Sequence, residues 1–127
     1  MVVKLKPNLA EVYFNMGLAY GRLSRYQEAI EAFKEGIRIK PNDAQAHNLL
    51  GITYGRLGRR HEAAEAFKEA IRIKPDYVEA YCNISRAYGV LGRYQEAVEA
   101  AKEAIRIKPG FAAVSYTHLT LPTIYSV

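Results

Sequence analysis

The sequence predicts an all-α protein, built as a solenoid of three helix–turn–helix units. Prolines stand at positions 7, 41, 75 and 109, and the phrase IRIKP ends at each of the last three, so the chain repeats itself every 34 residues. A period of this size is typical of stacked helix pairs. Within each unit, apolar residues recur at steps of three and four, which indicates helices rather than strands.

The period divides the chain into consecutive segments. Residues 1–9 contain VKLKP and match the end of a preceding unit. The three units are expected at 10–43, 44–77 and 78–111, and residues 112–127 follow as a tail. Because a repeat is expected on both sides of this stretch, we interpret the chain as a fragment of a longer array.

In each unit, a first helix is expected to pack on a second through one apolar face. Val12, Met16, Tyr20 and Leu23 share such a face in the first unit, and we expect them to pack against neighbouring helices. The second helix repeats the pattern and stops at the proline, which cannot donate to the helix ladder.

Glycine is expected at the turn between the two helices. Gly58 and Gly92 stand in the breaks LGRR and LGRY of the second and third units. Glycine tolerates the positive φ with which many helices end, so these residues predict where the first helix stops.

The residues at fixed offsets in the three units resemble the tetratricopeptide repeat. That family combines large aromatic, small and proline positions, and this sequence departs from it at Gly36, Ser85 and Ala101. The resemblance implies a right-handed superhelix of three repeats with a concave groove that binds a peptide or protein. The matching residues are Tyr13, Met16, Gly17, Tyr20, Ala29, Phe33 and Pro41 in the first unit; His47, Leu50, Gly51, Tyr54, Ala63, Phe67, Ala70 and Pro75 in the second; and Tyr81, Ile84, Tyr88, Ala97, Ala104 and Pro109 in the third.

The groove is expected to be lined by the opposite stripe of each first helix. This stripe carries apolar residues for a floor and arginines that can anchor an acidic or backbone-carbonyl partner. It also carries the mid-helix glycines Gly21, Gly55 and Gly89, which would leave room for a ligand backbone or are simply copied with the repeat. The candidate groove residues are Glu11, Phe14, Asn15, Leu18, Arg22, Gln45, Asn48, Leu49, Ile52, Arg56, Glu79, Cys82, Asn83 and Arg86.

Amides in this stripe suggest one way of holding a peptide. Asn15 and Asn83 occupy the same position of the repeat and Asn48 lies one residue from it, which is similar to the asparagine ladder of O-linked N-acetylglucosamine transferase, although Leu49 interrupts it. Other family members hold the carboxylate tail of heat-shock chaperones with cations. Here those places hold Phe14, Leu18, Leu49, Glu79 and Asn83, so that partner is not predicted.

The prediction for function is therefore a protein-interaction scaffold that binds a peptide or a partner surface in the groove. The first alternative is the repeat arm of an enzyme such as a glycosyltransferase of the O-GlcNAc transferase kind, whose catalytic domain lies elsewhere. The second is RNA binding through basic loops, for which the formal charge of +5 is the only support. In either case this chain itself is predicted not to be an enzyme.

No residue set predicts chemistry. We expect no catalytic residues, no metal site and no cofactor, because His47 and His61 lack other ligands at zinc spacing and Cys82 has no base in its unit. No apolar run approaches the length of a membrane span, so a membrane partner is not expected. The single cysteine favours a cytoplasmic location.

The tail differs from the repeats in composition. Residues 114–123 read VSYTHLTLPT, which resembles the translation of a transposon sequencing adapter, so we interpret 112–127 as a non-native tail. The last helix would then leave Ala101 and Ile105 uncovered, and self-association through this uncapped repeat is expected.

Overall fold

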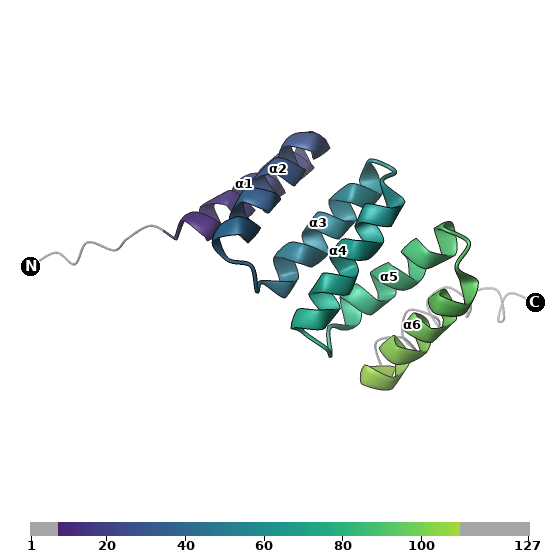
Figure 1. The fold of residues 1–127 in the computed structure, drawn as a ribbon. Helices are drawn as coiled ribbons and strands as arrows, with labels where there is room; N and C mark the ends of the chain where they lie inside the picture. Colours follow the sequence, from purple (N-terminus) through teal and green to yellow (C-terminus); the bar gives the residue numbers. More distant parts are fainter. Residues whose placement is uncertain (1–7, 110–127) are drawn as a thin grey trace, which may run out of the picture.

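The computed structural model describes residues 8–109, which form six α-helices and no strands (Figure 1). The tail at 112–127 and most of the segment 1–9 lie outside the described residues. The helices are α1 (Leu9–Arg22), α2 (Tyr26–Ile39), α3 (Ala44–Arg56), α4 (Arg60–Ile73), α5 (Val78–Val90) and α6 (Tyr94–Ile107).

The helices pack as three successive pairs. Helix α1 packs on α2, α3 on α4 and α5 on α6, while the contacts α2–α3, α4–α5 and α3–α5 join one pair to the next. Along the described chain each pair contacts its neighbours in sequence, as Figure 1 shows. The predicted all-α solenoid is confirmed.

The first helix of every pair ends in the same backbone motif. Gly58 and Gly92 have φ values of 76° and 78°, and the same position in the first unit is occupied by Ser24 with a φ of 59°. The next residue in the chain donates its N–H to a carbonyl five residues back, as Arg59 does to Tyr54 over 3.0 Å. This is the Schellman arrangement, in which a left-handed residue lets the freed carbonyls find donors.

Each pair is held together by a small residue on the first helix that faces a large one on the second. Gly17 lies against the ring of Phe33, and a Cβ on this glycine would stand 2.6 Å from Cε1 of the ring. Gly51 lies against the ring of Phe67 in the same way, with a corresponding distance of 2.5 Å. In the third unit the matching positions hold Ser85 and Ala101, so the first helix has a larger residue and the second a smaller one.

The departure at Ser85 is thereby explained. Its hydroxyl donates to the carbonyl of Ala97 over 2.7 Å, so the polar group is satisfied within the helix pair. Ala101 stands where Phe33 and Phe67 stand in the other units, so the third unit has no ring at this position.

The expectation that Val12, Met16 and Leu23 pack against neighbouring helices is wrong. These residues are 49%, 40% and 64% exposed. Among the described residues no helix precedes α1 to cover Val12 and Met16, whereas Leu57, which matches Leu23, is itself 41% exposed. The residues that match Met16 in the next two units, Leu50 and Ile84, are only 7% and 4% exposed, since α2 and α4 cover them.

The last helix has an exposed apolar face as well. Ile105 is 51% exposed and Val98 is 49% exposed, whereas Ala101 between them is half-buried. The expected exposure therefore holds for Ile105 and only in part for Ala101. None of the described helices is both long enough and apolar enough to cross a membrane.

Candidate groove along the first helices

Three adjoining cavities form a continuous depression across α1, α3 and α5, which we call the groove. The first cavity lies between α1 and α3, the second between α1, α2 and α3, and the third between α3, α4 and α5. Leu18 and Leu49 line both of the first two, while Ile52 and Arg56 line both of the last two. Their volumes are about 280, 370 and 280 Å³.

Most of the predicted groove residues line these cavities. They come from all three first helices, so the stripe deduced from the repeat frame corresponds to one surface. The lining residues from the prediction are Glu11, Phe14, Asn15, Leu18, Arg22, Gln45, Leu49, Ile52, Arg56, Asn83 and Arg86. The three others, Asn48, Glu79 and Cys82, do not line any of these cavities.

Asn48 is a buried structural amide rather than a groove contact. Its side chain is 5% exposed, and its Oδ1 accepts a hydrogen bond from Nδ2 of Asn83 over 3.1 Å. This bond joins α3 to α5 and directs one N–H of Asn83 away from any ligand. The expected amide ladder is therefore interrupted, because two of its three members bind each other and Leu49 separates Asn15 from them.

Phe14 is positioned by a glycine on the neighbouring helix. A Cβ on Gly36 would stand 2.4 Å from Cε1 of Phe14, so only glycine allows the ring to lie there. In the other two units the corresponding first-helix residue is smaller, and an alanine, Ala70 or Ala104, replaces the glycine. Phe14 therefore contributes both to the floor of the groove and to the packing of the first pair, a double role that its stripe position did not reveal.

Cys82 is half-buried on α5 and is not poised for reaction. Burial raises the pKa of its thiol, and the nearby carboxylate of Glu79 acts in the same direction. Glu79 itself is exposed in the first turn of α5. A thiol whose ionised form is disfavoured is a poor nucleophile.

The arginines outside the groove are paired in a repeated pattern. Each of them meets a glutamate three residues away in the same helix or turn: Arg25–Glu28, Arg38–Glu35, Arg59–Glu62, Arg72–Glu69, Arg93–Glu96 and Arg106–Glu103. The guanidinium hydrogen bonds hold the pKa of five of these carboxyls, those of Glu35, Glu62, Glu69, Glu96 and Glu103, below the usual glutamate value. This surface is therefore largely neutralised by its own side chains.

The four remaining described arginines line the groove and have no carboxylate partner within 4 Å in the described part of the chain. They are Arg22, Arg56, Arg60 and Arg86, all of them exposed. Arg22 and Arg56 stand in the last turns of α1 and α3, where a cation suits the negative helix end, whereas Arg86 lies in the body of α5. Glu11 and Glu79, in the first turns of α1 and α5, put negative charge at the opposite edge.

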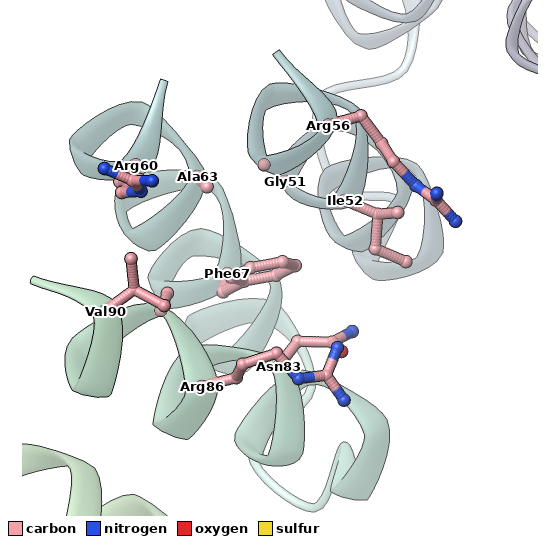
Figure 2. A pocket seen from close by; sticks show the side chains of 11 residues that line it. Gly51, Ile52, Arg56, Arg60, Ala63, Phe67, Asn83, Arg86 and Val90 are labelled. Atoms are coloured by element: carbon pink, nitrogen blue, oxygen red, sulfur yellow. The ribbon is translucent and has the colours of Figure 1, made fainter. Parts of the chain in front are cut away.

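Figure 2 shows the cavity between the second and third units. The side chains of Arg56 and Arg86 extend from facing helices on the same side of this cavity, with Ile52 and Asn83 between them. Arg60 lies at the opposite end, next to Val90. Sequence analysis did not assign Arg60, although a signal existed, since the other two units have tyrosine at this position.

The groove carries apolar, amide and guanidinium groups. Among the described residues, no three histidine, cysteine, aspartate or glutamate side chains are placed to hold a metal ion. Within residues 8–109, the groove presents an apolar floor, the amides of Asn15, Gln45 and Asn83, and guanidinium groups that have no carboxylate partner, which suit a peptide main chain and its side chains.

Comparison with known sequences identifies the family to which the repeat belongs. The sequence profiles of the tetratricopeptide repeat match residues 10–43 and 48–110, which is most of the chain. The chain belongs to the tetratricopeptide repeat family. No curated protein has a sequence that matches this chain.

Solved structures of tetratricopeptide repeat proteins share the fold. A crystal structure of MamA matches with a TM-score of 0.79 and 32% sequence identity. The match covers 84% of this chain and 63% of the MamA chain, so this chain spans less than two thirds of the length of MamA. The first repeat domain of Spaghetti (RPAP3), bound to the HSP90 peptide SRMEEVD, has a TM-score of 0.80 at 20% identity, over 98% of this chain and 99% of that domain. The Arabidopsis OM64 repeat domain has a TM-score of 0.79 at 23% sequence identity, and the match covers 89% of this chain and 97% of that domain. At these last two identities, the likeness concerns the fold alone.

Proposed function

We propose that this chain is a protein-interaction scaffold that binds a peptide, or an extended surface of a partner protein, in the groove across α1, α3 and α5. The observation that carries the proposal is the continuity of three cavities along the same face of three successive repeats. A continuous depression suits an extended ligand, whereas a single deep cavity would suit a compact one.

The size of the cavities supports the binding of side chains from a polypeptide. Each has a volume of about 280–370 Å³, near the lower end of the range of about 300–1,000 Å³ for small-molecule sites. Leu18, Leu49 and Ile52 form the apolar floor between them. Such spaces can each take one side chain of an extended peptide while its main chain bonds to the amides at the edges.

The family supports the same class of function. The two repeat domains of RPAP3 were both solved with an HSP90 peptide bound, which shows that a related fold can hold a peptide. This chain lacks cations at the places that some members use for chaperone tails. The proposal therefore concerns peptide binding in the groove and names no chaperone.

Selection from a phage-displayed library of random short peptides tests the proposal. We expect peptides to be enriched on the wild-type chain, and the substitution Ile52→Lys to weaken their binding by about tenfold or more, because it places a charge on the apolar floor. Ile39→Lys is the matched control, since Ile39 is 39% exposed, Ile52 is 37% exposed, and Ile39 does not line the three cavities.

Two results would contradict the proposal. One is a selection that enriches no peptide on a chain whose circular dichroism shows folded helices. The other is a set of peptides whose affinity falls with Ile39→Lys and not with Ile52→Lys, which would place the binding surface outside the groove.

A further inference from the structure

The cavity between the second and third units, shown in Figure 2, differs from the rest of the array in its charge. Arg86 stands where the first two units have Leu18 and Ile52, and Arg60 stands where both other units have tyrosine. Both arginines are exposed, so neither is part of the buried core that holds the helix pairs together. These two arginines do not recur, so the scaffold itself does not explain why they line one cavity.

The arginines of this cavity are also the ones without internal partners. Arg56, Arg60 and Arg86 have no carboxylate within 4 Å among residues 8–109, in contrast to the arginines on the outer surface, each of which pairs with a glutamate. Three guanidinium groups around one depression repel one another and attract anions. A partner that brings carboxylates would relieve this repulsion and form charge-assisted hydrogen bonds.

The floor of the cavity is apolar and narrow. Phe67 and Ala63 lie at its base, while Ile52 and Val90 form parts of its wall. Phe67 is only 4% exposed, and it is the one aromatic residue among those that line the cavity, so its ring offers no open face on which a nucleobase could stack. A volume of about 280 Å³ suits one aliphatic or aromatic side chain of a peptide.

We infer that this cavity binds an acidic segment of a partner protein, which seats one apolar side chain against the exposed Ile52 and Val90 and directs flanking carboxylates to Arg56 and Arg86. The inference rests on the proposed function and specifies its partner chemistry. Arg60, at the other end of the cavity, takes a further acidic residue of the same segment. The carboxylates belong to side chains within the segment, so a free chain end is not needed.

The test uses the peptides selected on the wild-type chain, synthesised with acetylated and amidated ends. We expect them to carry net negative charge around an apolar residue. We expect replacement of their acidic residues by glutamine or asparagine to weaken binding by about tenfold or more. The double variant Arg56→Gln/Arg86→Gln should lose affinity to a similar extent. The matched control Arg72→Gln/Arg106→Gln, which removes two outer arginines that pair with Glu69 and Glu103, should bind like the wild type.

Four outcomes would overturn the inference, and only the last would overturn the proposed function with it. Selected peptides that are neutral or basic would refute the acidic partner while leaving peptide binding in the groove intact. Affinity that is unchanged in Arg56→Gln/Arg86→Gln would show that the carboxylates bind elsewhere. Tighter binding of polyuridine RNA than of the acidic peptides, with loss in the same double variant, would assign the arginines to a nucleic acid. A selection that enriches no peptide would remove the inference together with the proposed function.

Discussion

The ring of Phe67 lies so close to the backbone of Gly51 that a Cβ on Gly51 would stand 2.5 Å from Cε1 of the ring. Both residues line the cavity of the three arginines, so the contact between α3 and α4 also sets the floor of that cavity. The same contact recurs between Gly17 and Phe33 in the first unit. Packing within the second unit and the floor of this cavity therefore depend on the same two residues, Gly51 and Phe67.

Gly51→Ala is expected to destabilise the fold. The added methyl group would force the buried ring of Phe67 to shift, at a cost of about 2–3 kcal/mol, and the better helix propensity of alanine recovers about 1 kcal/mol of this. We expect a net fall of about 1–2 kcal/mol in the free energy of unfolding, measured by urea denaturation. A variant as stable as the wild type would show that the ring does not occupy this space.

Gly55→Ala, one turn further along the same helix, is expected to have the opposite effect. A Cβ at Gly55 meets no atom within 4 Å, so only the gain in helix propensity remains. The free energy of unfolding should rise by about 0.5–1 kcal/mol in the same denaturation experiment. If the glycine is kept to make room for a ligand backbone, the variant should also bind the selected peptides more weakly. Lower stability in Gly55→Ala would contradict the open surface seen at this position.

Stability is expected to fall as the pH is lowered through the acidic range. Guanidinium hydrogen bonds lower the pKa of Glu35, Glu62, Glu69, Glu96 and Glu103 in the folded state, whereas in the unfolded chain these groups titrate near the ordinary value of about 4.3. Their contribution is complete above that value and is lost as the pH falls through the lower folded values. Urea midpoints from neutral pH down to about pH 3 measure the slope.

Salt provides the control for this effect. The pairs are exposed, so their contribution is modest and screened, and a high salt concentration should flatten the pH dependence. A urea midpoint that stays constant through the acidic range at low salt would contradict the assignment of these ion pairs.

Self-association through the exposed face of α6 is expected. Val98 and Ile105 are each about half exposed and present an apolar surface. In the earlier units, α3 packs on α2 and α5 packs on α4. Sedimentation velocity should show assembly that grows with concentration, and Val98→Lys/Ile105→Lys should reduce it. A chain that stays monomeric and melts above about 80 °C would contradict this expectation.

The fold could be predicted because each unit repeats the same physical constraints. Helical spacing, a break such as the one at Gly58, and a proline every 34 residues leave little choice of architecture. The exposure of Val12 and Met16 could not be deduced from their unit alone, because it depends on whether another helix covers that face.

The site was harder to predict because position on a helical stripe does not fix what a side chain contacts. Asn48 belongs to the stripe by spacing, yet it is buried and bound to Asn83. Phe14 lies partly against Gly36, and the matched exchange of large and small residues at these two positions was present in the sequence. Arg60 was overlooked because it lies on a second helix, although its departure from the repeat marked it.

The central claim is that the surface used by this protein is the groove across the first helices, and nuclear magnetic resonance tests it most directly. Titration of the labelled chain with a selected peptide should shift the signals of Leu18, Leu49, Ile52 and Asn83 far more than those of outer residues such as Lys68 and Glu99. Shifts concentrated on the outer residues, with the groove signals unchanged, would contradict the claim.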